Sequence, residues 1–190
     1  MEIALQNKEL IAIISKAAQG EQAAQQKLFQ TYASKMLSVC RYYINDLQYA
    51  EDVMITGFYK VFAHLATFRN EGSFEGWIRR IITREAISFL RQNKSMLFVD
   101  KEDLPDTADD DSLENNLAEY HIDTLQTLID DLPDGYRTVF LLYVMEDYSH
   151  KEIANMLHIS ESTSKTQLLK AKKMLKNKLE TVKERVNEFG

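Results

Sequence analysis

Residues 148–179, YSHKEIANMLHISESTSKTQLLKAKKMLKNKL, decide the fold class of this chain. Ser149 precedes Glu152 by three residues, which is the spacing of a capping box at the start of a helix. The apolar residues that follow recur at helical steps and stop at a short break, residues 158–160. Ser160 can then cap a second helix through a backbone amide of its first turn. The stretch predicts a helix-turn-helix, a module that lays its second helix in the DNA major groove.

The second helix of this module has two chemically different faces. One face is a stripe of small and apolar residues at three- and four-residue steps: Ser164, Leu168, Ala171, Leu175, Leu179 and Val182. The other face carries hydroxyl, amide and ammonium groups, which can reach base edges and neutralise phosphates. An ordinary solvated face of an amphipathic helix is the alternative interpretation. The candidate DNA-contacting residues are Ser160, Ser162, Thr163, Lys165, Thr166, Gln167, Lys170 and Lys173.

The composition favours an all-α fold. The 190 residues include only 2 prolines and 6 glycines, and strong helix formers are abundant. There is no run of 18 apolar residues and no signal-peptide pattern, so we expect a cytoplasmic protein without membrane insertion. The single cysteine, Cys40, cannot form an internal disulfide, and its apolar neighbours predict a small core residue.

The net charge of −6 is unevenly distributed along the chain. Residues 1–94 carry 12 Lys/Arg against 9 Asp/Glu, residues 95–131 carry 1 against 12, and residues 132–190 carry 10 against 8. Two mildly basic blocks are therefore joined by a strongly acidic segment. We predict two small helical domains, 1–94 and 123–190, joined by a flexible acidic linker at 95–122. Imitation of nucleic acid in a partner's basic channel is an alternative role for that segment.

The N-terminal block contains amphipathic helices, which we predict at about 5–18, 21–44 and 48–66. The third is the most regular, with an apolar stripe on one side of the helix. Its opposite face mixes polar with apolar groups: Asp52, Ile55, Thr56 and Tyr59. Either another helix of the domain covers the two apolar side chains of that face, or they dock a partner protein.

A fourth helix is predicted to begin near Phe74, with Ser73 as its cap. Its outer edge carries an indole and three guanidinium groups: Trp77, Arg80, Arg84 and Arg91. This combination suits a strand of unstacked bases, because the ring stacks on a base while the arginines hold phosphates. The alternative is that Trp77 is a core residue and that the arginines are merely solvated. Glu85 falls on the apolar side of the helix, and the sequence assigns it no role.

These segments together resemble the extracytoplasmic-function sigma factors, compact bacterial RNA polymerase subunits that keep regions two and four of the sigma-70 family. Residues 50–62, AEDVMITGFYKVF, are similar to the polymerase-binding helix of region two. Residues 68–81, FRNEGSFEGWIRRI, are similar to the loop and helix that engage the −10 promoter element. Residues 132–140 and 148–154 are similar to region four, which reads the −35 element. The sequences around residues 149–152 and 163–165 resemble those of Bacteroidetes-type members of the subfamily.

The resemblance implies a role for each surface. The face of the third helix would dock the clamp helices of the polymerase β′ subunit, and the C-terminal domain would meet the β flap. The −10 loop and helix would capture a flipped base and hold the melted strand through Asn70, Glu71, Ser73, Trp77, Arg80, Arg84 and Arg91. The candidate residues of the second helix would lie in the −35 major groove. Core polymerase and promoter DNA are thus the expected partners, and many relatives also bind an anti-sigma protein.

The chain departs from the family pattern in the turn and in the second helix of the helix-turn-helix. The family usually has glycine in the turn where this chain has His158, and a left-handed backbone there costs a histidine about 1 kcal/mol. The family often places arginine where Lys170 and Lys172 stand. Lysine neutralises phosphate but cannot make the two-pronged contact to guanine, which affects base discrimination at these positions.

The resemblance predicts a specificity subunit, monomeric when free, that directs promoter-specific transcription initiation. A conventional helix-turn-helix repressor or activator is the alternative, and it predicts a homodimer on a palindromic site. An enzyme is not expected. The four histidines lack metal-ligand spacing, and the chain has neither a glycine-rich phosphate loop nor a recognisable nucleophile elbow. We therefore predict no catalytic residue, no metal and no cofactor.

Overall fold

The computed structural model describes residues 2–93 and 122–188, with side chains described for residues 8–93 and 126–182. The chain divides into two compact units, Met1–Asn93 and Lys94–Gly190. Within the described ranges the regular elements are all helical and include no strand, which confirms the all-α prediction. The predicted acidic linker lies outside the described residues, apart from Ile122, where a helix begins.

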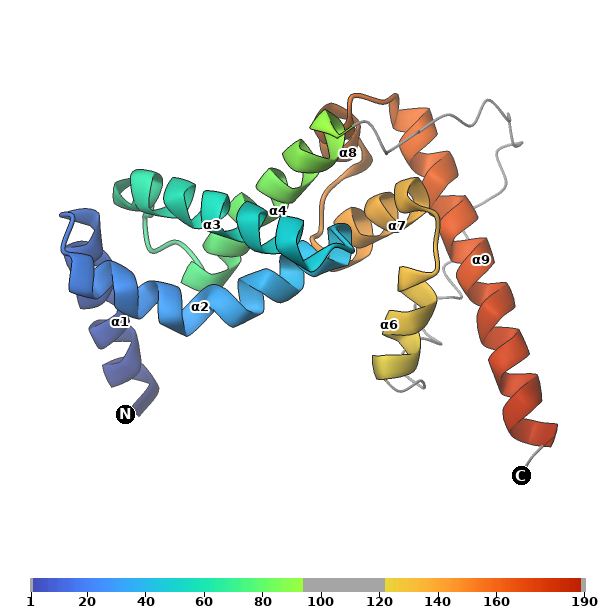
Figure 1. Cartoon of the computed structure of the whole chain (residues 1–190), viewed down its shortest axis with the longest axis horizontal. Helices are drawn as coiled ribbons and strands as arrows, with labels where there is room; N and C mark the ends of the chain where they lie inside the picture. The colour runs from blue at the N-terminus through green and yellow to red at the C-terminus, as the bar shows by residue number, and fades with distance from the viewer. Residues whose placement is uncertain (1, 94–121, 189–190) are drawn as a thin grey trace. The chain divides into compact units, whose positions relative to one another are not determined.

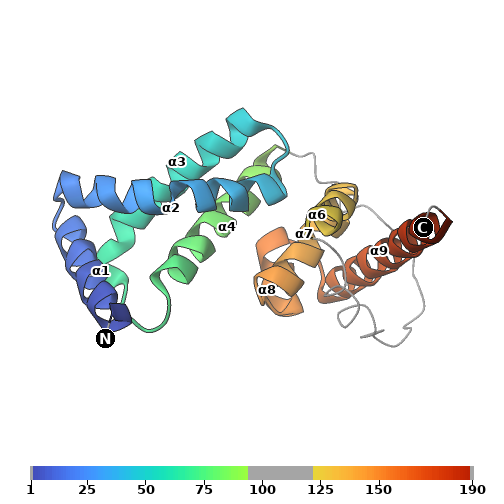
Figure 2. The ribbon, with the colours of Figure 1, turned by 90° about the horizontal axis from the view of Figure 1, so that it is seen from below.

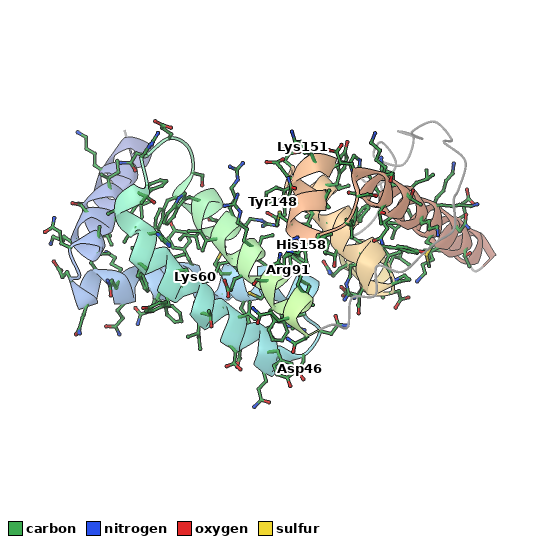
Figure 3. The ribbon with its side chains drawn as sticks, turned by 90° about the horizontal axis from the view of Figure 1, so that it is seen from above. Asp46, Lys60, Arg91, Tyr148, Lys151 and His158 are labelled. Atoms are coloured by element: carbon green, nitrogen blue, oxygen red, sulfur yellow. The ribbon has the colours of Figure 1, made fainter. Side chains whose placement is uncertain are left out.

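The N-terminal unit consists of four α-helices and one short 3₁₀ turn. Their bounds are α1 Glu2–Ala18, α2 Gln22–Tyr43, α3 Leu47–His64, η1 Leu65–Thr67 and α4 Phe74–Gln92. Each predicted helix is present, and its ends differ from the prediction by no more than a few residues. Helices α3 and α4 run antiparallel side by side, with Asp46 and Arg91 at the same end of the pair (Figure 3).

A glycine allows α3 and α4 to approach closely. A Cβ atom added to Gly57 would lie 2.4 Å from Cδ1 of Ile82, whose side chain is completely buried. Contact at that distance would force the buried Ile82 side chain to move, so glycine is the residue that allows the present packing. Helix α2 packs against both α3 and α4 and completes the core with its own apolar stripe (Figure 2).

Short polar side chains fix where these helices begin. Asp46 caps α3 by accepting a hydrogen bond from the amide of Tyr49 at 3.0 Å. Ser73 caps α4 by accepting one from the amide of Gly76 at 3.3 Å, as the sequence predicted. Both caps satisfy an amide that the first helical turn would otherwise leave without a partner.

The C-terminal unit is built around one long helix (Figure 1). Over residues 122–188 its elements are α6 Ile122–Asp130, α7 Asp134–Phe140, η2 Leu141–Met145, α8 His150–Leu157 and α9 Glu161–Glu188. The segment η2 is a π-helical turn, in which the amide of Glu146 donates to the carbonyl of Leu141 at 3.2 Å. Helices α6, α7 and α8 each pack against α9, which supplies the central stripe of the core.

The start of α7 is held by a buried arginine. Arg137 is only 3% exposed, and its guanidinium donates to the carbonyl of Asp130 at 3.0 Å and to the carboxylate of Asp134 at 2.7 Å. These bonds tie the end of α6 to the start of α7 across Pro133. A guanidinium that bridges a carbonyl and a carboxylate fixes the angle between the two helices, because its donors lie in one plane.

Candidate DNA- and partner-binding surfaces

The capping box predicted at the start of α8 is present. The amide of Glu152 donates to Oγ of Ser149 at 3.3 Å, and the amide of Ser149 donates to Oε2 of Glu152 at 2.9 Å. The Ser149 hydroxyl also donates to the same carboxylate at 2.7 Å. Both ends of the reciprocal pair are therefore made, and α8 begins at a fixed residue.

The turn between α8 and α9 has the conformation that the sequence implied. His158 has φ 56 and ψ 43, so a residue with a Cβ stands in the left-handed region, which glycine adopts at lower cost. Its amide donates to the carbonyl of Ala154, which closes the end of α8. Ser160 then caps α9 by accepting from the amide of Thr163 at 3.0 Å, as predicted. The result is a compact helix-turn-helix.

A second contact, which the sequence did not indicate, locks α8 to α9. The ring of His150 shares a 2.9 Å hydrogen bond between Nδ1 and Oγ of Ser164, which is completely buried. The ring of Tyr143 stacks on His150 with centroids 4.7 Å apart. The only signal available beforehand was a serine within an otherwise apolar stripe, which required a polar partner from another element.

Most of the predicted DNA-facing residues of α9 lie on its surface. Exposed positions are Ser160, Ser162, Lys165 and Lys173, and half-exposed positions are Thr163, Thr166 and Lys170. The hydroxyls of Ser162 and Thr163 both meet that of Ser160, at 2.7 and 2.8 Å. The start of α9 thus presents a small cluster of hydroxyl groups, followed by ammonium groups along the same face.

One predicted DNA-contacting residue, Gln167, is buried instead. Gln167 is only 3% exposed, so the prediction that its side chain faces outward is wrong for this structure. It stands three residues after Ser164 and four before Ala171, and it therefore belongs to the buried side of the helix. Lys170 is half-exposed, with its ammonium 5.8 Å from the centroid of the Tyr136 ring. Lys172 is 7% exposed, so like Gln167 it lies on the buried side of α9.

The outer face of α3 is open to solvent. Asp52, Ile55, Thr56 and Tyr59 are all exposed, with Ile55 at 57% and Tyr59 at 75%. Of the two interpretations offered by the sequence, coverage by another helix is thereby excluded within the described N-terminal unit. Large apolar side chains this exposed are typical of a protein-docking surface.

The loop before α4 has the backbone of a tight turn. Asn70 and Gly72 both have positive φ, 56 and 97, and the exposed side chains include Asn70, Glu71 and Ser73. The hydroxyl of Ser73 is engaged in capping α4. Beyond the cap, the exposed guanidinium groups of Arg80, Arg84 and Arg91 follow one edge of the helix. The loop and this edge therefore form one continuous polar surface on α4.

Trp77 is partly a core residue and partly a surface residue, so each of the two interpretations of the sequence holds in part. It is half-buried, and its ring stacks on Phe74 with centroids 5.9 Å apart and an interplanar angle of 17°. Phe68 contacts both rings, at 5.1 Å from Phe74 and 5.4 Å from Trp77. Part of the indole thus belongs to an aromatic cluster, and the remainder stays exposed beside the arginine edge.

Two carboxylates of the N-terminal unit, Glu75 and Glu85, shift the pKa values of neighbouring groups. The side-chain hydrogen bond from Lys35 to Glu75, 2.8 Å long, raises the pKa of the Lys35 ammonium and ties α2 to the start of α4. Burial, with the charge of Glu85 adding to it, raises the pKa of the Cys40 thiol to about 12. Cys40 is fully buried, as the sequence predicted, and its thiol is therefore protonated and unreactive at neutral pH.

Among the described residues, no cluster of histidine, cysteine and carboxylate side chains could hold a metal ion. No helix within the described ranges is long and apolar enough to cross a bilayer.

Comparison with known proteins identifies the family. Residues 28–96 match the model for sigma-70 region 2, and residues 122–175 match the model for sigma-70 region 4. The RNA polymerase sigma factor SigZ of Bacillus subtilis is 30% identical over 139 residues, covering 72% of this chain and 76% of that protein. The chain therefore belongs to the sigma-70 family of RNA polymerase sigma factors and functions in transcription initiation.

Further relatives point to the extracytoplasmic-function subfamily. SigV of Bacillus subtilis is 29% identical over 72% of this chain and 80% of its own length. The ECF RNA polymerase sigma-E factor of Haemophilus influenzae is 25% identical over 89% of this chain and 94% of its own length. A solved structure of CnrH in complex with the cytosolic domain of CnrY aligns over 90% of this chain at 19% identity, with a TM-score of 0.48.

Proposed function

We propose that the two units divide the work of promoter recognition. The N-terminal unit, 1–94, docks core polymerase through the outer face of α3 and holds the −10 strand along α4. The C-terminal unit, 123–190, reads the −35 element with α9. The observation that carries this proposal is the open face of α3, where Ile55 and Tyr59 stand exposed beside Asp52 and Thr56.

The residues of the −10 surface follow from the loop and edge of α4. Asn70 and Glu71 would meet a flipped base in the turn before the helix, where the positive φ of Asn70 opens the loop. The exposed part of Trp77 would stack at the junction of duplex and open strand, and Arg80, Arg84 and Arg91 would hold phosphates. Ser73 contributes chiefly by fixing the start of α4.

The proposed −35 surface contains fewer residues than the sequence suggested. Ser162, Lys165, Thr166, Lys170 and Lys173 are exposed or half-exposed on α9, and Ser160 and Thr163 fix its first turn. Gln167 is omitted because it is buried. Ammonium groups supply phosphate contacts, and hydroxyls supply short contacts to base edges.

The free protein is expected to bind duplex DNA weakly, because its net charge is −6. Tethering both units to polymerase supplies the missing affinity through a high effective concentration. Docking on the β′ clamp helices and the β flap, a monomeric free state, a cytoplasmic location, an anti-sigma partner and a Bacteroidetes-type source remain predictions.

The test of docking uses matched apolar substitutions. Ile55→Ala combined with Tyr59→Ala should weaken binding to core polymerase by at least tenfold, because exposed apolar anchors dominate such interfaces. Ile11→Ala is the control, since Ile11 is also exposed, at 45%, but belongs to a different helix, α1. Equal affinity of all three proteins in a pull-down or titration with core polymerase would overturn the proposal.

The test of −35 reading uses the salt dependence of promoter binding by the assembled polymerase. Lys165→Gln and Lys173→Gln should each lower the slope of log affinity against log salt concentration by roughly one. Lys178→Gln is the control, because Lys178 is paired with Asp131 at 3.0 Å and lies toward α6. Slopes that do not change would remove α9 as the DNA-contacting helix.

A further inference from the structure

Glu85 is the one acidic residue of α4 that the sequence left without a role, and it has a specific partner. Its carboxylate accepts a hydrogen bond from Nζ of Lys60 on α3. The Glu85 side chain is only 16% exposed, whereas that of Lys60 is 47% exposed. The ion pair therefore joins α3 to α4, with the carboxylate as its more buried member. Figure 3 labels Lys60 on α3.

The location of this ion pair connects the two proposed surfaces of the N-terminal unit. Lys60 directly follows Tyr59, the most exposed apolar residue of the docking face. Glu85 directly follows Arg84, in the middle of the arginine edge. Neighbouring residues of one helix lie within a Debye length of each other, so a net negative charge on Glu85 lowers the positive potential along the arginine edge.

Packing prevents the carboxylate from moving away. The close approach of Gly57 to Ile82 and the contact of Tyr49 with Phe89, with ring centroids 5.4 Å apart, hold α3 against α4. The charge of Glu85 is also felt by Cys40 on α2, so the carboxylate stands where three helices meet. The Glu85 carboxylate is therefore held in a fixed position beside α3, where the Lys60 ammonium is its ion-pair partner.

We propose that Lys60 masks the charge of Glu85 and thereby keeps the arginine edge of α4 attractive to the −10 strand. This inference rests on the proposed function, because it assumes that α4 holds a single strand. It makes Lys60 an affinity-determining residue that acts through Glu85 and need not touch the strand. It also predicts that Glu85 becomes harmful to strand binding only when Lys60 is missing.

The test measures binding of a single-stranded −10 oligonucleotide by the full chain in complex with core polymerase, at several salt concentrations. Lys60→Gln should weaken strand binding about fivefold at low salt, and added salt should reduce that loss. The double variant Lys60→Gln/Glu85→Gln should restore affinity to within twofold of the wild type, because the unmasked charge is gone. Polymerase affinity and Trp77 fluorescence should change little in either variant.

The control is Lys27→Gln, which breaks the exposed α1–α2 ion pair of Lys27 and Glu9, 3.1 Å long, and should leave strand binding unchanged. Wild-type affinity in Lys60→Gln would overturn the inference. So would a double variant as weak as Lys60→Gln, because the pair would then act only through structure. Wild-type protein that binds no strand with polymerase present would overturn the proposed function itself, and this inference with it.

Discussion

The helix-turn-helix of α8 and α9 and the helix pair of α3 and α4 achieve precise surfaces by different means. In the first, Ser149, Glu152, His158 and Ser160 set the geometry through bonds that span only a few residues. In the second, Gly57 meets Ile82 and Lys60 meets Glu85 across a separation of 25 residues. One surface is built by local caps, and the other is built by tertiary packing.

This difference determines how far the effect of a substitution extends through the structure. A lost cap frays one helix end and leaves the remaining core intact, since each cap contributes only about 1 kcal/mol. A changed contact between α3 and α4 shifts two helices whose outer faces carry two different proposed functions. We therefore expect packing substitutions to exceed cap substitutions in effect, and the following predictions test that order.

The largest effect is expected at Gly57. Gly57→Val should lower the free energy of unfolding by about 2–3 kcal/mol, because the added atoms collide with buried Ile82. Gly76→Val is the matched control in α4, where an added Cβ meets only Cβ of Ser73, at 3.8 Å. Urea unfolding followed by the fluorescence of Trp77, the single tryptophan, measures both variants. Similar losses in the two variants would show that the contact between Gly57 and Ile82 does not set the cost of the substitution.

The next effect depends on pH and concerns the buried thiol. Since the folded state raises the pKa of Cys40 to about 12 from 9.0, the unfolded chain loses this proton first as pH rises. The stabilisation is complete below pH 9 and declines toward pH 12, by up to about 1.4 kcal/mol per pH unit. Unfolding at pH 8 and pH 10 should show a smaller decline in Cys40→Ala than in the wild type. Parallel declines would contradict this assignment.

A smaller effect is expected at the cap of α8. Ser149→Ala removes the acceptor for the Glu152 amide and should cost the helix-turn-helix about 1 kcal/mol. Ser38→Ala is the control, because Ser38 lies exposed within α2 and its hydroxyl bonds only the carbonyl of Ser34, at 3.2 Å. Hydrogen exchange of the α8 amides should accelerate about fivefold in the first variant. An unchanged rate would mean that tertiary contacts, not the cap, hold this end.

The smallest effect should be a gain in stability. His158→Gly relieves a left-handed residue with φ 56 and should stabilise the C-terminal unit by up to about 1 kcal/mol. His158→Ala retains a Cβ and should give no such gain. Slower exchange of buried α9 amides in the glycine variant alone is the expected result. Equal exchange in both variants would show that the turn carries no measurable strain.

Much of the helix-turn-helix was predictable, because its signals lie close together in the sequence. The spacing of Ser149 and Glu152, the break at His158 and the cap at Ser160 all appear in the structure as predicted. Gln167 was misplaced because helical spacing alone did not separate the edge of the stripe from its outer neighbours. The contact of Lys170 with Tyr136 could not be predicted from the sequence, since Tyr136 lies on another helix, α7.

The surfaces of the N-terminal unit were predictable only in part. Periodicity correctly separated the exposed Ile55 and Tyr59 from the apolar stripe of α3. It could not decide whether Trp77 belonged to the core or to the surface, because that depended on Phe68 and Phe74 folding against it. Nor could it find the cation opposite Glu85, which stands on a different helix.

The sequence by itself determined the helices, their caps, the left-handed turn and the two-unit organisation, because these follow from spacing, capping chemistry and charge along the chain. Only the tertiary structure decided how closely α3 and α4 pack, how much of Trp77 remains exposed and which charge neutralises Glu85. The reason is physical. Local bonds involve neighbouring residues, whereas contact distances and partial burial depend on side chains that folding alone brings together.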